Sequence, residues 1–514
     1  MKQFMFATVL ALSLGVTAQG ANYYVDGTAL RLGSGQAKGG DGSAKTPFAT
    51  IQAAADVAQA GDTVFIKPGT YTESVKPKNS GKDGSPITFR NCPGEERPTI
   101  CAGDRVTGPW TLETNGIYWA SCKWGMGPGR NQVVADGDLM IEAREPNIAG
   151  KEDLVEVRRQ KKLFGCKIPE NKAAQKAWYV PGSNVVVVSG GPKWGEDVWK
   201  GGVIWACDGW ASQSAIITNS QAVGDGYRLL VGAMTEQWWF PWAGACFLTG
   251  AKGALDADKE FFLDEAAGRL YFRAPGGVYP SRLAIYAKKR VTVMDMSGLT
   301  NVVFDGVNTM MGGITMSRAT RCALLNGRHL YSCHFYTFAD GRGDQPLGTT
   351  PDDPAASAIY ISGESNRIEG CEIAYATTGV RLAGRNHVVR NCIVSDIYGG
   401  NYFSNIFIDF RFPVGGESGG HLIERNTIRR GSRGLVHWTS TDTVTPYTKS
   451  RILHNDLSDF MMLAYDGGAI YSWTVNGGGT EIAYNWIHGD GDVDYAAIYF
   501  DDNDQNFIAH HNVI

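Results

Sequence analysis

The chain has 514 residues, a formal net charge of -4 and a charged fraction of 19%. Basic residues form no clustered stripe, which argues against a nucleic-acid partner. Sixty-five glycines and 14 tryptophans favour a β protein with many tight turns and much aromatic surface. None of the ten cysteines lies in a CxxC pair, which argues against zinc or redox chemistry. We expect some of them, Cys333 and Cys371 included, to be buried apolar side chains rather than disulfide partners.

Residues 1–20 have the pattern of a secretory signal peptide. Lys2 precedes an apolar run at 4–16, and small residues follow it up to Gly20 and Ala21, where we expect cleavage. The run is short for a membrane span, and no later segment reaches the roughly 18 apolar residues that a spanning helix needs. We therefore predict a secreted or periplasmic protein with no membrane span.

Residues 21–125 predict an N-terminal cap followed by the first coils of a stack of strands. A strand at 23–27 precedes a helix at 51–59, and strand signals resume at 61–66. A helix here can cover the open end of stacked strands. Residues 126–285 lose this pattern, and alternating apolar residues at 184–188 indicate a β-rich inserted subdomain.

A repeat runs through residues 286–514 and has the form apolar-x-x-[Asn/Cys/Asp]-x-apolar. Its copies are Val302, Asp305, Val307; Leu330, Cys333, Phe335; Ile368, Cys371, Ile373; Val388, Asn391, Ile393; Ile423, Asn426, Ile428; Ile452, Asn455, Leu457; and Ile482, Asn485, Ile487. The apolar residues share one face of a strand, and the middle residue lies at a bend, where stacked asparagines can bond along the axis. The sequence thus predicts an all-β fold, a right-handed parallel β-helix with an N-terminal capping helix. Because residues 512–514 stop inside a repeat, we expect the chain to continue.

Two neighbouring repeats carry the densest acidic and aromatic residues. Their Ala-Ile-Tyr strings begin at Ala469 and Ala497, one coil apart, which puts Asp466 one rung from Asp501 and Asp502. Rungs lie about 4.8 Å apart, within reach of the roughly 5 to 9.5 Å carboxyl separations of glycosidases. We take these aspartates as catalytic candidates, with Asp501 pointing outward; the alternative is that they only form turns.

Aromatic and polar residues nearby are candidates for sugar binding. Three aromatic side chains could stack against a sugar ring, or they could form a solvent-facing aromatic ladder without a ligand: Tyr471, Trp473 and Tyr499. Four residues on the preceding coils can line a subsite or be structural: His437, Trp438, Asp409 and Arg411. No cofactor is predicted. The run Asp490-x-Asp492-x-Asp494 leaves Ca²⁺ open, although a solvated turn fits it better.

The motifs together resemble β-helix glycoside hydrolases, family 141 most closely and families 120 and 110 more distantly. The resemblance rests on the pectate-lyase-like cap, Ala143-Arg144-x-Pro146-Asn147, the segment 255–271 and the two aspartate motifs, and it covers nearly the whole mature chain. It implies that the aspartates supply an acid and a nucleophile or base, acting on fucosylated or xylan-type plant polysaccharide. At 255–260 the chain departs from the family, where a Pro-Gly pair is commoner, which leaves the substrate open.

The sequence is compatible with three functions. The first is a hydrolase of plant or algal polysaccharide or oligosaccharide. The second is a lyase on uronate chains, which needs a Lys or Arg base and often Ca²⁺; the available residues are Arg429, Arg430, Arg433 and Lys449, with Asp409 or Asp442 for the metal. The third is a non-catalytic glycan-binding surface solenoid.

Overall fold

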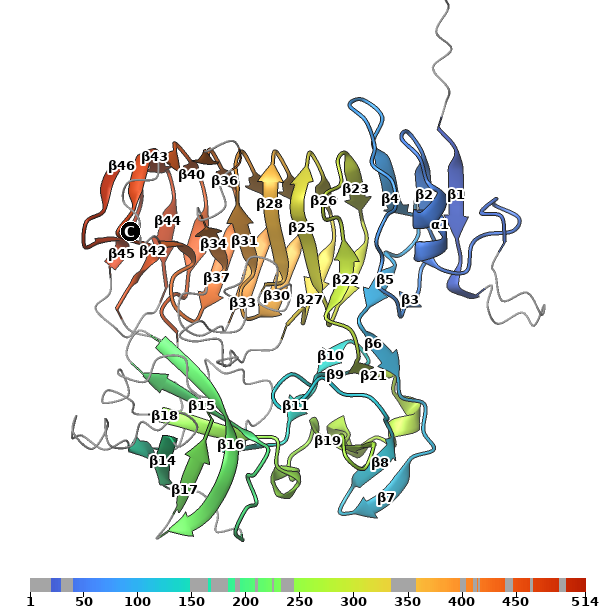
Figure 1. Cartoon of the computed structure of the whole chain (residues 1–514), viewed down its shortest axis with the longest axis vertical. Helices are drawn as coiled ribbons and strands as arrows, with labels where there is room; N and C mark the ends of the chain where they lie inside the picture. The colour runs from blue at the N-terminus through green and yellow to red at the C-terminus, as the bar shows by residue number, and fades with distance from the viewer. Residues whose placement is uncertain are drawn as a thin grey trace, which may run out of the picture.

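The computed structural model describes a chain built almost wholly of strands (Figure 1). The described residues are 20–28, 40–147, 165–167, 184–189, 195–208, 211–223, 226–232, 245–333, 357–397, 404–409, 414, 417–439, 447–462, 466–489 and 496–514. Three long parallel sheets wind around one apolar core, so the predicted right-handed parallel β-helix is confirmed. The expected signal peptide falls almost entirely outside the described residues. Within them, no helix is long and apolar enough to cross a membrane.

Each coil contributes one strand to each sheet. The 11-stranded sheet holds β1 (Asn22–Val25), β2 (Thr63–Ile66), β4 (Ile87–Asn91), β23 (Val302–Asp305), β26 (Ala323–Leu325), β29 (Arg367–Glu369), β32 (Val388–Arg390), β36 (Leu422–Glu424), β40 (Arg451–Leu453), β43 (Asn476–Ala483) and β46 (Gln505–His510). The nine-stranded sheet holds β3 (Thr70–Tyr71), β5 (Thr99–Cys101), β24 (Asn308–Met310), β27 (Arg328–Leu330), β30 (Glu372–Ala376), β33 (Ile393–Ile397), β37 (Thr427–Gly431), β41 (Asp456–Ser458) and β44 (Trp486–His488).

The eight-stranded sheet carries the aspartate motifs. It holds β22 (Thr292–Asp295), β25 (Gly313–Thr320), β28 (Ile359–Glu364), β31 (Val380–Ala383), β34 (Ile406–Asp409), β38 (Val436–Thr439), β42 (Gly468–Trp473) and β45 (Ala496–Asp501). A short parallel pair, β35 (Ser418–Gly419) and β39 (Tyr447–Thr448), extends two coils between sheets.

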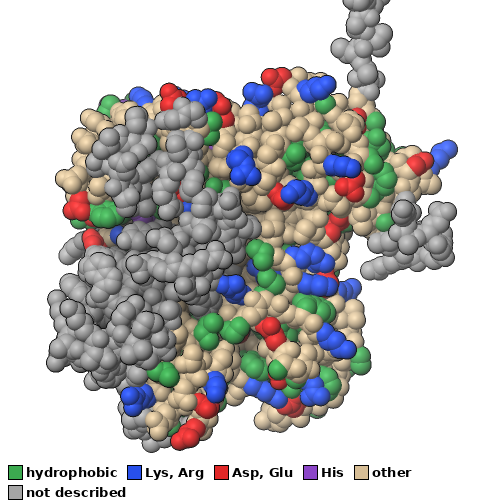
Figure 2. Space-filling model, in the orientation of Figure 1, with side chains coloured by type: hydrophobic (Ala, Val, Ile, Leu, Met, Phe, Trp, Pro, Cys, Tyr) green, Lys and Arg blue, Asp and Glu red, His purple; other side chains and the backbone are tan. Residues whose placement is uncertain are grey.

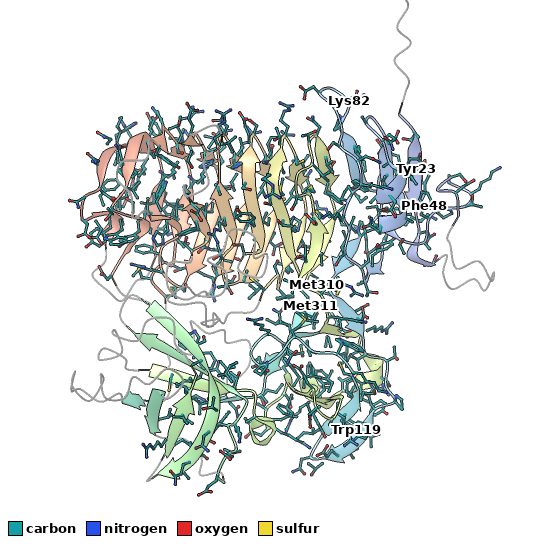
Figure 3. All side chains as sticks on the ribbon, viewed as in Figure 1. Tyr23, Phe48, Lys82, Trp119, Met310 and Met311 are labelled. Atoms are coloured by element: carbon teal, nitrogen blue, oxygen red, sulfur yellow. The ribbon has the colours of Figure 1, made fainter. Side chains whose placement is uncertain are left out.

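The cap is built around helix α1 (Ile51–Val57). Thr50 Oγ1 accepts a hydrogen bond from the Ala53 amide, and the Glu73 carboxylate accepts from the Ile51 and Gln52 amides, so the helix begins with its free N–H groups satisfied. Its apolar face, with Ile51 fully buried, joins the core of the first coils. Tyr23 and Phe48 pack together beside it, with ring centroids 5.9 Å apart (Figure 3). The predicted capping helix is therefore present, two residues shorter than expected.

Stacked asparagines hold the bend between the 11- and nine-stranded sheets. Asn426, Asn455, Asn485 and Asn512 form a ladder in which each Oδ1 accepts from the backbone N of the previous asparagine at 3.0 Å. Each Nδ2 donates to a carbonyl of the preceding coil, as Asn455 does to Ile423 O at 3.0 Å. All three fully interior members are buried. The predicted asparagine stacking is confirmed.

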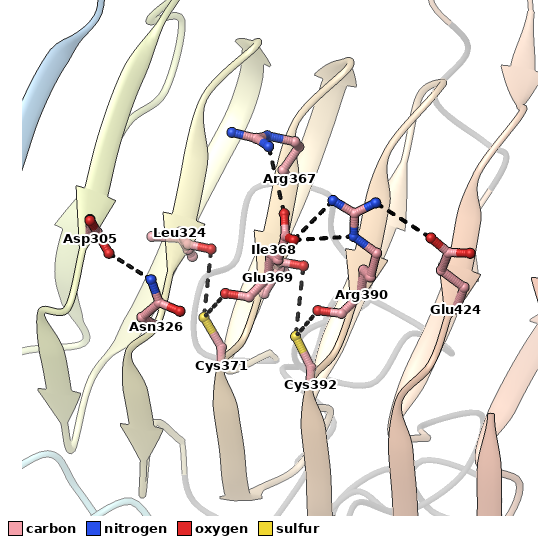
Figure 4. Close-up of polar contacts among 10 residues, drawn as sticks. All are labelled: Asp305, Leu324, Asn326, Arg367, Ile368, Glu369, Cys371, Arg390, Cys392 and Glu424. Carbon is pink, nitrogen blue, oxygen red and sulfur yellow. Dashed lines mark hydrogen bonds and ion pairs between the residues drawn. The ribbon is translucent and has the colours of Figure 1, made fainter. Parts of the chain in front are cut away.

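Cysteines continue the same ladder toward the N-terminus. The thiol of Cys392 lies 3.7 Å from Ile368 O, the carbonyl contact that asparagine amides make elsewhere, and the Cys392 amide donates to Asn426 Oδ1 (Figure 4). Seven described cysteines are free and buried, Cys333 and Cys371 among them, as expected. Cys246 in the insertion is disulfide-bonded.

Three of the first four repeat copies need a correction of register, whereas the copy Ile368, Cys371, Ile373 is placed correctly. Ile368 pairs with Val389, and Cys371 is followed in the ladder by Cys392, so the predicted copy Val388, Asn391, Ile393 is wrong by one residue. That shift places Ile393 on the outer face, where it is 41% exposed. Upstream, Phe304, Leu324 and Ile368 pair in turn, so the copies that began at Val302 and Leu330 were also misplaced. Phe335 lies outside the described residues.

The insertion leaves the solenoid after β5 and returns at β22. It holds a four-stranded sheet of β6 (Gly103–Arg105), β9 (Val133–Ala135), β10 (Asp138–Leu139) and β21 (Ile285–Lys288), and a five-stranded sheet of β7 (Thr111–Thr114), β8 (Ile117–Ser121), β11 (Ile141–Glu142), β19 (Glu260–Asp264) and β20 (Arg269–Arg273). A seven-stranded sheet holds β12 (Arg144–Glu145), β13 (Gly165–Lys167), β14 (Asn184–Ser189), β15 (Val203–Asp208), β16 (Ala211–Val223), β17 (Gly226–Val231) and β18 (Ala245–Thr249). Short 3₁₀ turns are η3 (Lys252–Ala254), η4 (Pro275–Gly277) and η5 (Pro280–Arg282).

This excursion begins earlier than the predicted boundary at residue 126, because β7 pairs with β8 and β8 pairs with β20, so neither strand joins a coil. The solenoid itself is uninterrupted, since β4 pairs directly with β23 and β5 with β24. Met310 and Met311 lie where the coils meet the four-stranded sheet (Figure 3). Within the insertion, Asn147 Nδ2 donates to Asp256 Oδ1 at 2.7 Å, which joins the two sequence motifs that lie there.

Candidate active site

The site lies on the outward face of the eight-stranded sheet. Strand pairing places one row of outward side chains in register along six coils: Tyr360, Arg381, Phe407, His437, Tyr471 and Tyr499. The residues before them, such as Ile359 and Ile470, are fully buried in the core, so alternation along each strand turns this row outward.

Asp466 and Asp501 lie on neighbouring coils beside this row. β42 and β45 pair in parallel, with Trp473 opposite Asp501. Asp466 precedes β42 with a left-handed backbone (φ 60°), and its carbonyl accepts from Arg433 Nη2 at 3.0 Å. Partial burial raises the pKa of Asp466, the Arg433 cation opposes this rise, and the charge of Asp501 adds to it. The two carboxyl groups therefore interact electrostatically, and both burial and the charge of Asp501 make Asp466 harder to ionise than a free aspartate.

Asp501 is held by hydrogen bonds to both oxygens. Tyr471 Oη donates to Oδ2 at 2.8 Å, and the Asp502 amide donates to Oδ1 at 2.8 Å. The Tyr471 ring is 4% exposed and lies under the Arg433 guanidinium, 4.7 Å from ring centroid to Cζ. Burial raises the pKa of Tyr471, so its hydroxyl remains a donor. Asp501 is thus oriented by a tyrosine that a cation covers.

The neighbouring acids divide into two roles. Asp502 is exposed, and its carboxylate accepts from the indole N–H of Trp473 on the previous coil. Asp504, which sequence reasoning missed, accepts from the Val475 and Asp501 amides at 2.6 and 3.1 Å and from the Ser472 hydroxyl. Asp504 therefore builds the turn that follows β45. Its signal in the sequence was an aspartate three residues after Asp501, a spacing typical of side-chain-capped turns.

The predicted aromatic wall is reduced to two members. Trp473 and Tyr499 are partly exposed, whereas Tyr471 is buried and meets Tyr499 edge to face, with centroids 5.5 Å apart at 71°. Tyr471 also meets the edge of His437 at 4.9 Å. Trp473 and Tyr499 thus remain available for stacking, and Tyr471 supports the acids from behind.

Trp438 was wrongly predicted to bind substrate. Its side chain lies inside the coil, fully buried, with its indole N–H donating to Tyr447 Oη at 3.3 Å and its ring against Phe507. Neighbouring strand residues point to opposite faces, so His437 and Trp438 cannot both face outward.

Two further predicted subsite residues are outward but buried. His437 is fully buried, and burial together with Arg433 holds its pKa well below the usual range, so the ring is neutral. Asp409 is 1% exposed and accepts from Arg381 Nε at 3.0 Å. Either charge of this pair would be costly in the interior without the other. We therefore assign Asp409 a structural role, which corrects its predicted role in substrate binding. Arg411 lies outside the described residues.

The basic residues considered for a lyase are dispersed. Arg429 and Arg430 belong to β37 of the nine-stranded sheet, where Arg430 pairs with Asp396 at 2.6 Å, and Lys449 pairs with Glu481 at 3.0 Å. Arg433 alone of the four lies beside the aspartates. No group of three or more metal-ligating side chains occurs among the described residues; Asp442 and the 490–494 run fall outside them.

Comparison with known proteins supports the fold of this chain. No known family model matches the chain. A 66-residue segment is 44% identical to the uncharacterized protein YwoF of Bacillus subtilis (strain 168) and covers 13% of this chain and 14% of that protein. A solved structure described as a glycoside hydrolase has a TM-score of 0.57 at 14% identity, over 96% of each chain. A structure of XylC with xylose has a TM-score of 0.47 at 13% identity, over 95% of this chain and 68% of its own. The chain thus shares the β-helix fold of the first of these.

Proposed function

We propose that the protein is an exported glycoside hydrolase acting on plant or algal polysaccharide or oligosaccharide. The observation that carries the proposal is that Asp466, just before β42, and Asp501, at the end of β45, lie on neighbouring coils, and the charge of Asp501 adds to the rise that burial causes in the pKa of Asp466. Glycosidases need such a pair, one carboxyl protonated and the other ionised. The fold shared with a glycoside hydrolase agrees with this reading.

In the proposed mechanism Asp466 is the general acid. A raised pKa suits a group that transfers a proton to the glycosidic oxygen as the bond to the sugar breaks. Asp501 is the carboxylate that attacks the anomeric carbon or deprotonates a water, and Tyr471 and the Asp502 amide orient it. Arg433 stabilises this arrangement by bonding the Asp466 carbonyl. Trp473 and Tyr499 provide the stacking surface for the sugar.

A uronate lyase is the second candidate, because Arg433 lies next to the acids. Arginine resists deprotonation, and the guanidinium of Arg433 already bonds Asp466 O and covers Tyr471. A base role would require it to leave both partners. The hydrolase therefore accounts for more of the contacts.

The test is an activity screen of the exported protein on neutral and acidic plant and algal glycans, with reducing ends and ultraviolet absorbance measured together. New reducing ends without an absorbing product support a hydrolase. An absorbing, unsaturated product would identify a lyase. Binding without either signal would identify a glycan-binding solenoid and overturn the enzyme proposal.

A further inference from the structure

A hollow lies at the N-terminal end of the eight-stranded sheet, the sheet that also carries the aspartates. It has a volume of about 470 Å³ and is lined by Ser74, Val75, Lys76, Thr292, Asp295, Ser297, Thr315, Ser317 and Arg318. The segment around Val75 pairs with β22, and β22 pairs with β25, so three adjacent chain segments form the hollow. β25 is five coils from β42, which at about 4.8 Å a coil is roughly 24 Å from the aspartates.

The lining is polar and hydroxyl-rich. Five of its nine residues are serine or threonine, and only Val75 is apolar. Hydroxyl groups both donate and accept, which matches the hydroxyls of a sugar ring. Lys76 and Asp295 form an ion pair at 2.7 Å, and the second Asp295 oxygen accepts from the Ser297 amide at 2.9 Å. Both oxygens of the Asp295 carboxylate therefore have a partner, and the ammonium of Lys76 balances its charge.

Arg318 supplies the remaining charge of the hollow. Its backbone N donates to Ser362 Oγ on the next coil at 2.8 Å, which fixes the residue at the rim. In the part of the chain that the structure describes, its guanidinium has no carboxylate partner. Other arginines nearby do have one: Arg321 pairs with Asp83 at 3.0 Å, and Arg290 pairs with Asp104 at 2.7 Å.

We propose that this hollow binds an acidic sugar residue, whose carboxylate or sulfate group pairs with Arg318 while its hydroxyls bond the serine and threonine lining. The planar guanidinium matches a carboxylate or sulfate with two parallel hydrogen bonds. The choice of a sugar as ligand rests on the proposed function. The hollow is a separate binding site that would anchor acidic glycan away from the aspartates.

The experiment compares two arginine variants of equal backbone geometry. Arg318 and Arg321 both have φ of 52°, a left-handed conformation that asparagine tolerates well, so Arg318→Asn and Arg321→Asn should both fold. Calorimetric binding is measured on the Asp466→Asn background, which blocks turnover. The probes are trigalacturonate, a sulfated galactan oligosaccharide and neutral galactotriose.

We expect the two acidic probes to bind at least about tenfold more tightly than galactotriose, and Arg318→Asn to remove that advantage while Arg321→Asn keeps it. The preferred acidic probe tells a carboxylate site from a sulfate site. Equal binding of acidic and neutral probes, or unchanged acidic binding in Arg318→Asn, would overturn the proposal. Full turnover by Asp466→Asn would instead contradict the proposed function and leave the Arg318 comparison interpretable.

Discussion

The same C-terminal coils present two very different polar regions. At the bend, each coil repeats one residue and one set of bonds, as Asn426, Asn455 and Asn485 do. On the outward face of the eight-stranded sheet, successive coils present Arg381, Phe407, His437, Tyr471 and Tyr499, a row that changes residue type from coil to coil except at its last two members. The repeated asparagine serves the stacking of the coils. The row that does not repeat is not required by stacking, and the proposed catalytic residues lie beside it.

The outer surface of the coils also carries charged side chains that pair from one coil to the next. Figure 2 shows Lys and Arg interspersed with Asp and Glu over the visible side of the molecule. Arg390 bonds Glu369 at 2.9 Å and approaches Glu424 at 3.5 Å, so one cation links the carboxylates of the coils before and after its own (Figure 4). Exposed pairs of this kind contribute about 0 to 1 kcal/mol each.

Removing either paired aspartate should give the largest effect. We expect Asp466→Asn and Asp501→Asn to lower kcat by roughly 10²- to 10⁴-fold or more on a cleaved glycan, the range for general acid–base groups. Thermal melting should change little, because neither carboxyl group is fully buried. Asp305→Asn, a carboxylate on the 11-stranded sheet, is the control and should keep full activity. A double variant that remains active would remove both residues from the mechanism.

Breaking the asparagine ladder should cost stability rather than chemistry. Asn455→Ala leaves the Asn426 amide and the Ile423 carbonyl without their partners in a dry interior, which should lower the free energy of unfolding by about 3 kcal/mol. Urea denaturation measures the shift. The exposed Asn506 bonds only Asn476 among described side chains and has a left-handed backbone (φ 59°), so the control is Asn506→Gly, which tolerates that backbone and should change stability by less than about 0.5 kcal/mol. An equal loss of stability in both variants would mean that the buried ladder contributes no more to stability than an exposed asparagine does.

A second buried ladder predicts how stability depends on pH. His387 Nδ1 accepts from the Asn366 amide, Nε2 donates to Ala383 O at 2.7 Å, and burial lowers the pKa of His387 to about 4 from 6.5. The unfolded chain therefore binds a proton that the folded chain refuses between about pH 6.5 and 4, so stability is lost as pH falls through this window, by about 2 to 3 kcal/mol for this residue.

The variant His387→Asn should flatten that loss. Asn366 occupies the same ladder position one coil earlier, so asparagine can keep the stacking bond. The stability difference between pH 7 and pH 4.5, from urea denaturation, should shrink relative to the parent. His454→Asn, at an exposed position, should leave the difference unchanged. An unchanged difference in His387→Asn would mean that other groups govern the acid instability.

Tyr471→Phe should have the smallest of these effects. It deletes only the hydroxyl that donates to Asp501 and keeps the ring under Arg433. Loss of one hydrogen bond to a charged group, about 1.5 kcal/mol, predicts a roughly tenfold lower kcat with KM nearly unchanged. Tyr484→Phe, at an exposed tyrosine, is the control. A change in KM alone would assign Tyr471 to sugar binding instead of to the orientation of Asp501.

Local sequence patterns predicted the repeating features of the fold. They missed features that depend on which face of a strand a residue occupies, or on packing between residues far apart in the sequence. The fold, the capping helix, the asparagine stack and the one-coil relation of Asp466 to Asp501 follow from spacing along the chain. At 388–393 both Asn391 and Cys392 fit the bend, and only pairing with Ile368 decides between them. The burial of His437 and Asp409 could not be read from alternation, because alternation gives the face of a residue but not what covers it.

The insertion also has a consequence for the order in which the protein assembles. Its two ends meet where β6 pairs with β21, so the excursion closes on itself before the solenoid resumes. β4 and β5 find their next neighbours only in β23 and β24, after the whole insertion has been synthesised. The first coils therefore lack a stacking partner until the chain beyond the insertion is available, and until then the edge of β4 is open to pairing with other chains.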